Sequence, residues 1–202
     1  MRVEAKNIVI IRLSDRELSD AVLTAHRIVG TIIDRWDLHE RDYLERFIDS
    51  LLGEIAERMV LRWLKDNGKF AESAVDKKAL TPDVGHDIWL KNLQGEQICA
   101  SIKSSISVLK NNPGDILQTF TLATKPKELR DVNIQVCFWL DPFSSPRTNV
   151  PTMQQAAIMA WALKEDLVKE EFIPYTREEQ RTAPAKRLCE LRAMGNLLSI
   201  LS

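Results

Sequence analysis

The apolar residues near the start of the chain first form a short run and then recur at helical spacing. Residues 7–12 (NIVIIR) are mostly β-branched, which is typical of a strand. They are followed by Ser14-Asp15-Arg16-Glu17, a capping-box pattern in which two side chains satisfy the free amides at a helix start. Apolar positions continue at helical spacing to Trp36. The pattern therefore predicts a strand and then a helix from residue 14 to about residue 36.

From residue 43 to residue 64 the apolar residues come in pairs, each pair four positions after the last. This spacing predicts a helix, but a strict four-residue repeat drifts by about 40° per turn around a helix of 3.6 residues per turn. The stripe must therefore wrap around the helix or the helix must break. Gly53 is the weakest point, so we predict a break there and a second helix that ends near Asn67-Gly68.

The pattern becomes strand-like after residue 86. Residues 87–90 and 97–105 are predicted to form a β-hairpin around the turn-like residues 92–95. Because side chains alternate along a strand, Ser101 and Lys103 are predicted to share one face of it. Residues 132–140 (VNIQVCFWL) are almost uniformly apolar, which favours a central strand of a sheet.

The remaining segments are predicted to be helical. A helix is expected from Asp115 to Leu122, and residues 151–202 are expected to form two or three helices, of which residues 152–172 are the clearest. We thus expect one α/β domain over residues 1–202. Its mixed sheet of four or five strands would be flanked by helices, with additional helices at both ends.

Composition narrows the function only slightly. The formal net charge of −1 gives no electrostatic argument for nucleic acid, so any phosphate-binding surface must be a local patch. Three widely spaced cysteines, Cys99, Cys137 and Cys189, favour reduced thiols and a cytoplasmic location. The chain starts without a signal-peptide pattern, and no stretch is apolar enough to span a bilayer, so no membrane association is expected.

Candidate chemistry lies in the predicted hairpin. Hydrolysis of a phosphodiester needs an activated water and positive charge on the oxygens that gain negative charge, and a carboxylate-bound Mg²⁺ with a lysine can supply both. Asp87 opens the first strand, and Lys103 lies on the second, in a segment with no other charged residue between residues 98 and 105. A lysine in a half-buried strand is costly, which favours a functional role for it.

Residues 81–88 (TPDVGHDI) followed by residues 101–105 (SIKSS) resemble the motif of the PD-(D/E)xK, or restriction-endonuclease-like, nuclease superfamily. The helix around Gly53-Glu54-Ile55-Ala56 is similar to the helix that precedes this motif in many members. The resemblance covers residues 50–140. It implies a restriction-endonuclease-like mixed sheet flanked by helices.

The resemblance also implies roles for individual residues. Asp87 matches the metal-binding aspartate, Lys103 the lysine beside the attacking water, and Glu54 a helix glutamate that supplies a further Mg²⁺ ligand. The chain departs from the motif at Ser101, where the family has its second carboxylate, although some members also carry Ser-x-Lys and recruit an acid from a helix. Besides Glu54, the candidates for this acid are Glu57 and Asp115.

Two assignments stay open at this point. Asp83, in a literal Pro-Asp, competes with Asp87 for the metal-binding role, and Asp87 is preferred because an apolar strand follows it directly. Glu54 with Arg58 also has the spacing of an i,i+4 ion pair, so a solvated helix face is as good an explanation as catalysis.

The resemblance implies a Mg²⁺-dependent endonuclease that cuts double-stranded DNA, such as a type II restriction enzyme or a similar defence nuclease, acting as a homodimer. One alternative is a nuclease-fold subunit that is active only with a partner subunit in a larger complex. Another is a catalytically inactive DNA-binding module, which Ser101 suggests.

Overall fold

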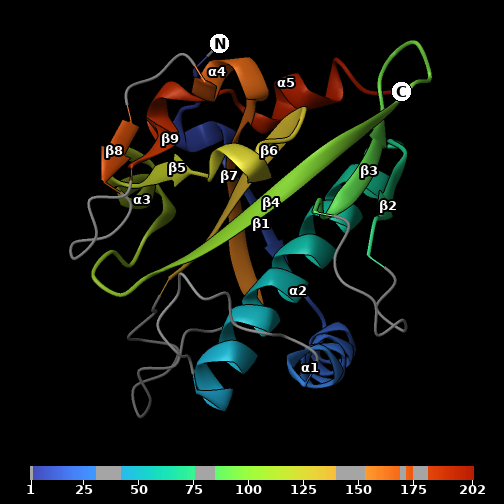
Figure 1. Ribbon diagram of the computed structural model, residues 1–202, viewed down its shortest axis with the longest axis vertical. Helices are drawn as coiled ribbons and strands as arrows, with labels where there is room; N and C mark the ends of the chain where they lie inside the picture. The colour runs from blue at the N-terminus through green and yellow to red at the C-terminus, as the bar shows by residue number, and fades with distance from the viewer. Residues whose placement is uncertain (1, 31–41, 76–84, 140–152, 169–171, 175–181) are drawn as a thin grey trace.

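The computed structural model describes residues 2–30, 42–75, 85–139, 153–168, 172–174 and 182–202 as two β-sheets with helices around them (Figure 1). The larger sheet has six strands, in the spatial order β1 (Val9–Arg12), β7 (Gln155–Leu163), β6 (Val132–Trp139), β4 (Gln97–Ser107), β3 (Ile88–Lys91) and β2 (Ala71–Ser73). The smaller sheet has the order β5 (Thr121–Ala123), β9 (Thr182–Arg187) and β8 (Phe172–Pro174). In the larger sheet β4 and β6 run parallel, and the other neighbouring strands run antiparallel. The architecture is a mixed α/β fold.

The helices differ greatly in length. They are α1 (Asp15–Val29), α2 (Tyr43–Asp66), α3 (Pro113–Thr119), α4 (Lys164–Val168) and α5 (Met194–Leu198), with short 3-10 helices η1 (Ala5–Asn7), η2 (Pro126–Glu128) and η3 (Leu188–Glu190). The capping box at Ser14 is confirmed, because the Ser14 hydroxyl accepts from the Glu17 amide and the Glu17 carboxylate accepts from the Ser14 amide. No helix in the described ranges is long and apolar enough to cross a membrane.

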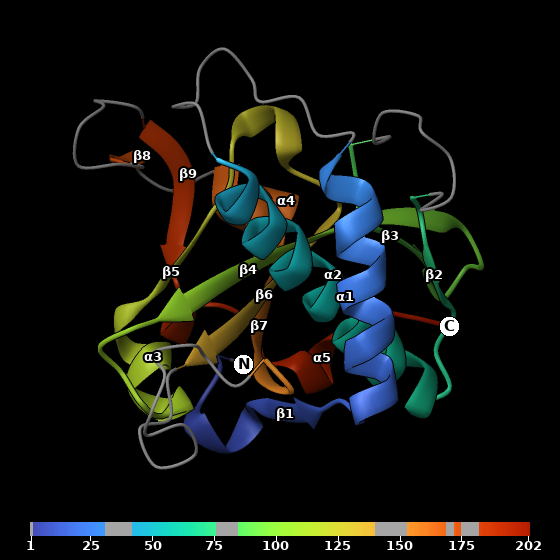
Figure 2. The same ribbon diagram turned by 90° about the horizontal axis from the view of Figure 1, so that it is seen from below.

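The two faces of the larger sheet carry different partners (Figure 2). We call the face that presents Ala100 and Ile102 of β4 the helix face, because these residues pack in one core cluster with α2 and α1. We call the opposite face, which presents Ser101 and Lys103, the mixed face. A second core cluster lies there, built with residues of α3, β5 and η3. In Figure 2 helices α1 and α2 gather on one side of the molecule, with the smaller sheet and α3 on the other.

The predicted break at Gly53 is wrong, since α2 continues from Tyr43 to Asp66 without interruption. Gly53 is exposed, and a Cβ at this position would contact nothing within 4 Å. Packing therefore does not require a glycine here. A single glycine in a helix costs about 1 kcal/mol, which packing of the flanking turns can outweigh. The drifting stripe instead wraps around the helix: α2 contacts α1 as well as β4.

The predicted helical C-terminal part is also wrong in its main element. Residues Gln155–Leu163 form strand β7, which lies between β1 and β6 in the sheet. Strands β8 and β9 follow, so helices make up only short stretches, α4, η3 and α5, of the described C-terminal residues. Residues 156–162 are all buried. A strand covered on both faces shows an unbroken apolar run, which periodicity cannot distinguish from a buried helix.

The hairpin of β3 and β4 is confirmed, with the Gly95 amide donating to the Asn92 carbonyl in its turn and Gly95 at a φ of 80°. Strands β1 and β6 also lie where they were predicted. The sheet has six strands rather than four or five. The predicted helix from Asp115 to Leu122 is shorter and earlier, because it ends at Thr119 and β5 begins at Thr121. Helix α1 is described to Val29, and the predicted end near Trp36 lies outside the described residues.

Candidate functional site

The candidate site lies on the mixed face of β4, beside the start of β3. The antiparallel register pairs Ile88 with Ala100, so Asp87, one residue before β3, lies beside Ser101. Lys103 lies two residues further along β4, on the same face as Ser101. The structure thus brings three of the residues named by the motif, Asp87, Ser101 and Lys103, to one face of two adjoining strands.

The Asp87 carboxylate is held by the neighbouring strand. Its Oδ2 accepts a hydrogen bond from the Ile102 amide at 2.5 Å and another from the Ser101 hydroxyl at 3.2 Å. The strand pairing with β3 stops at Ala100, so the carboxylate satisfies a backbone amide that lies beyond the last paired residue. Hydrogen bonds to an ionised acceptor are the stronger kind. Asp87 is therefore fixed in position, although the bond to Ile102 is also one that a purely structural aspartate would make.

Ser101 cannot supply the negative charge of the missing carboxylate, but its side chain contacts Asp87. Its side chain is buried, at 3% exposure, and its hydroxyl donates to Asp87. An aspartate or glutamate here would place a second negative charge beside Asp87. Serine instead orients the one carboxylate that is present.

Lys103 has an acidic partner that the sequence analysis missed. Its Nζ lies 2.9 Å from Oε2 of Glu128, at the end of η2, and both side chains are 28% exposed. The two residues are 25 positions apart and meet because β4 and β6 are parallel neighbours, with η2 directly before β6. Sequence spacing could not predict this contact, because the register of a parallel pair is not set by a short turn. Glu128 is thus in direct contact with the predicted catalytic lysine.

A second contact ties the segment before β6 to the residues before β3. A Cβ at Gly85 would lie 2.8 Å from Nη2 of Arg130, and Gly85 has a φ of 87°. The Arg130 Nη1 group donates to the carbonyls of Lys127 and Leu129, at 2.9 and 2.8 Å. Gly85 is therefore required by its backbone conformation and by the guanidinium beside it. This places a fixed positive charge beside Gly85, two residues before Asp87 in the sequence.

The motif glutamate Glu54 lies on the other side of the sheet from Lys103. It is carried by α2, which packs on the helix face, and it is 4% exposed. Its Oε1 accepts from Nε of Arg58 at 2.6 Å, and the Arg58 guanidinium also donates to Thr24 of α1. The i,i+4 ion pair is thus present, with the Glu54 side chain buried and the Arg58 side chain partly exposed. Glu57, 7% exposed, lies on the same helix.

The other two candidate acids do not join the cluster. Asp115 is exposed in the first turn of α3, where its amide and carboxylate are bonded to Asn112, the N-cap residue. This is a local capping arrangement. Asp83 lies outside the described residues.

The polar character of the mixed face continues along β6. Gln135 pairs with Lys103 in the register and is 4% exposed; its amide donates to the Ser105 hydroxyl and to the Val136 carbonyl. Cys137, the next residue on this face, is a free thiol 3.3 Å from the Ser105 hydroxyl. Burial raises the pKa of the Cys137 thiol to about 11. Polar residues here are paired with one another, which allows a buried strand pair to carry them.

The fit to a metal ion depends on Asp87. Mg²⁺ is commonly bound by one or two carboxylates together with substrate phosphates and water. The described ranges contain no group of three or more His, Cys, Asp and Glu residues that could hold a metal ion. The described donors therefore fit Mg²⁺ only in the substrate-assisted form, with Asp87 as the protein ligand.

Comparisons of this chain with protein-family models, with curated proteins and with solved structures found no match.

Proposed function

We propose that this chain is a Mg²⁺-dependent endonuclease that hydrolyses phosphodiester bonds of double-stranded DNA, in the manner of restriction enzymes or similar defence nucleases. The observation that carries the proposal is the common face of Asp87 and Lys103, with the Asp87 carboxylate fixed by Ser101 and the Ile102 amide. A homodimer would present one such site to each DNA strand.

Each residue has a chemical task in this proposal. A bound Mg²⁺ would lower the pKa of a water molecule and stabilise charge on the phosphate oxygens. Asp87 would hold the ion, and the bonds from Ser101 and Ile102 to Oδ2 would orient its carboxylate for this task. Lys103 would place its positive charge on the phosphate or orient the attacking water, which requires its amine to leave Glu128 or to share it.

Two residues are the main candidates for the acid that assists Asp87 in binding Mg²⁺, and a different observation supports each. Glu54 has the motif position, but it lies on the helix face and is paired with Arg58. Glu128 has no motif position, but it lies 2.9 Å from Lys103 on the mixed face. We favour Glu128, because an acid that acts on the same phosphate as Lys103 must reach the same face.

The test is plasmid digestion with Mg²⁺ by the wild-type chain and by Asp87→Asn and Lys103→Met. Each variant is expected to lower the cleavage rate by about 100-fold or more, since loss of one charged or proton-transferring group has this order of effect. Exposed positions of the same residue types provide matched controls, Asp20→Asn on α1 and Lys65→Met on α2, and both should cleave like the wild type. Equal cleavage by Asp87→Asn and the wild type would refute the proposed site.

A measurement of metal binding can decide between Glu128 and Glu54. Calorimetric titration of Mn²⁺ into Glu128→Gln and Glu54→Gln should show the weaker binding in Glu128→Gln. The reverse order would return the assignment to Glu54. Circular dichroism of both variants separates loss of binding from loss of fold, which matters most for the buried Glu54.

The ion pair of Lys103 with Glu128 also supports a second candidate function, a DNA-binding module that has lost cleavage or needs a partner subunit to release the lysine. In that case plasmid would stay intact with the wild type and Mg²⁺. A gel-shift assay would then show equal DNA binding by the wild type and Asp87→Asn. Cleavage that appears only when a partner is added would favour the partner-dependent form.

A further inference from the structure

The mixed face of the larger sheet is covered over some strands and partly exposed over others. Over β6 and β7 it carries the second core cluster, and both strands are buried along nearly their whole length. Strand β3 instead alternates, because its residues on the helix face are buried while Trp89 and Lys91 on the mixed face are partly exposed. We call the mixed face over β3 and β4 the open half. Asp87 and Lys103 of the candidate site lie on it.

An aromatic side chain of the open half lies close to the candidate site along β3. Trp89 follows Asp87 by two residues, and the register pairs Trp89 with Cys99, two residues before Ser101 on β4. Because side chains alternate along a strand, Trp89 shares the face of Asp87 and Ser101. Two residues along a strand span about 7 Å, which is about two steps of a stacked DNA strand. A nucleotide beside a phosphate held at Asp87 is therefore within reach of the indole ring.

The Trp89 ring packs against a buried neighbour. The His86 imidazole meets it edge to face, with the ring centroids 4.1 Å apart and an interplanar angle of 71°. His86 is 7% exposed, and within the described residues its buried Nε2 atom has no hydrogen-bond partner. His86 therefore supports the indole ring by packing. A ring that is already held in place loses little conformational entropy when a ligand stacks on it.

The charges of the open half are mixed, so they do not by themselves select a ligand. The open half carries the cations Lys91 and Lys103 and the acid Asp87, and the exposed Glu72 of β2 extends the same face. Lys103 is in addition paired with Glu128. A ligand must therefore gain affinity from the aromatic surface, since stacking does not depend on an excess of positive charge.

We propose that Trp89 stacks on an unpaired base of the DNA substrate, next to the phosphate held at Asp87. The inference rests on the proposed function, because it names the form of DNA that the site takes, a duplex with an unpaired nucleotide beside the cut. Every base has a flat π-face, so an aromatic platform accepts any of them. A duplex that already contains an unpaired base avoids the cost of extruding one. Bulged DNA is therefore expected to bind more tightly than an intact duplex.

Fluorescence anisotropy titration tests the proposal with two probes, an intact duplex and the same duplex with a central bulge of unpaired thymidines. EDTA is present, so that no Mg²⁺-dependent cleavage occurs. The wild type is expected to bind the bulged duplex about tenfold more tightly, which is the order of effect of one base stacked on an aromatic ring. Trp89→Leu should lose this preference, and Trp89→Phe should retain most of it. Tyr43→Leu, at an exposed aromatic position of α2, is the control and should behave like the wild type.

The comparison of the two probes on the wild type needs no variant, so it decides the matter even if Trp89→Leu folds poorly. Equal affinities for the two duplexes, or an unchanged preference in a folded Trp89→Leu, would overturn the inference. A shift of Trp89→Leu from dimer to monomer in sedimentation would also overturn it, because the open half would then be a contact between two copies of the chain.

This result is separable from the test of nuclease activity. Plasmid cleavage by the wild type without any preference for the bulged duplex would support the proposed nuclease and overturn the stacking role of Trp89. A preference that depends on Trp89, without cleavage in Mg²⁺, would support the stacking role and overturn the nuclease.

Discussion

The two faces of the larger sheet use the same strands for different purposes. On the helix face, β4 and β6 present apolar residues such as Ala100 and Ile134, which pack in one core cluster with α2. On the mixed face the same strands present Ser101, Lys103 and Gln135, which are held by hydrogen bonds and one ion pair. Strand alternation therefore gives one β4 segment both an apolar side and a polar side.

This difference between the two faces explains why the candidate acids Glu54 and Glu128 lie in different environments. Glu54 is in the helix layer, where a charge must be neutralised inside the core, and Arg58 does so at 2.6 Å. Glu128 is at the edge of the mixed face, where it and Lys103 are both partly exposed, so their ion pair can open without leaving a fully buried charge. An acid that takes part in a reaction must be able to leave its ion-pair partner, and this favours Glu128 on the mixed face over Glu54.

The largest effect on stability is expected from the helix face. Ile55 of α2 is fully buried in its core, so Ile55→Ala should lower the free energy of unfolding by about 2–5 kcal/mol. Urea denaturation followed by circular dichroism measures this change. Leu23→Ala on α1, where the side chain is 55% exposed, is the matched control and should change the stability by less than about 0.5 kcal/mol. Similar losses in both variants would contradict the described packing.

A smaller loss is expected from the mixed face, where a single polar residue connects β6 to the segment before it. Asn133 is fully buried; its side chain accepts from the Arg130 amide and donates to the Arg130 carbonyl, at 3.2 and 2.7 Å. Asn133→Ala leaves both backbone groups without this partner, so it should cost about 1–3 kcal/mol. Asn111→Ala, at an exposed position, is the control.

The same variant links stability to the candidate site. Arg130 and Glu128 belong to one short segment, so loosening it should also change the environment of Lys103. Backbone NMR of Asn133→Ala should show shifts at Lys103 that Ile55→Ala does not produce. Equal perturbation of Lys103 by both variants would mean that the two faces are not independent.

The contrast between the faces also explains which features could be predicted from sequence. The β3–β4 hairpin follows from alternation and a glycine turn within 20 residues, so the common face of Ser101 and Lys103 was predictable. Strand β7 was not, because it is covered on both faces and shows no alternation. Glu128 was missed because it reaches Lys103 through the parallel pairing of β4 with β6, a long-range contact without a local signal. A single sequence therefore indicates the motif lysine but not the acid beside it.

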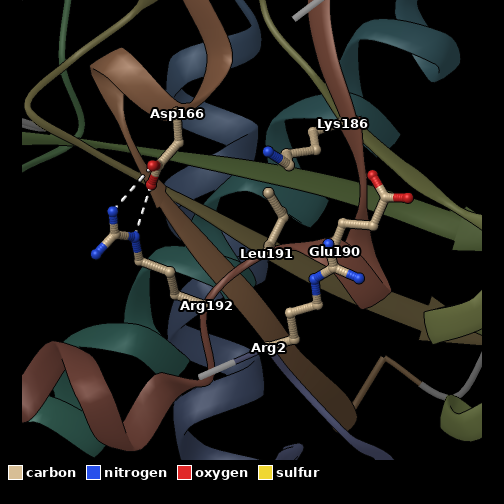
Figure 3. A pocket seen from close by; sticks show the side chains of 6 residues that line it. All are labelled: Arg2, Asp166, Lys186, Glu190, Leu191 and Arg192. Atoms are coloured by element: carbon tan, nitrogen blue, oxygen red, sulfur yellow. Dashed lines mark hydrogen bonds and ion pairs between the residues drawn. The ribbon is translucent and has the colours of Figure 1, made fainter. Parts of the chain in front are cut away.

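The smallest effect is expected at the ion pair of Asp166 with Arg192 (Figure 3), where both side chains are partly exposed. Near neutral pH, Asp166→Asn should lower the free energy of unfolding by about 1 kcal/mol or less, because solvent screens an ion pair at such a position. The sign of the pH dependence follows from the lowered pKa of Asp166. A carboxyl group whose pKa is lower in the folded protein stabilises the fold fully above its ordinary pKa of 3.8, and this contribution is lost as the pH falls through the folded value. The wild type and Asp166→Asn should therefore differ in urea denaturation near neutral pH and converge below pH 3.8. A difference that persists unchanged in acid would mean that Asp166 acts through its shape and hydrogen bonds rather than through its charge. The contact of Asp166 with Arg192 would then resemble the hydrogen-bonded residues of the mixed face more than an ion pair.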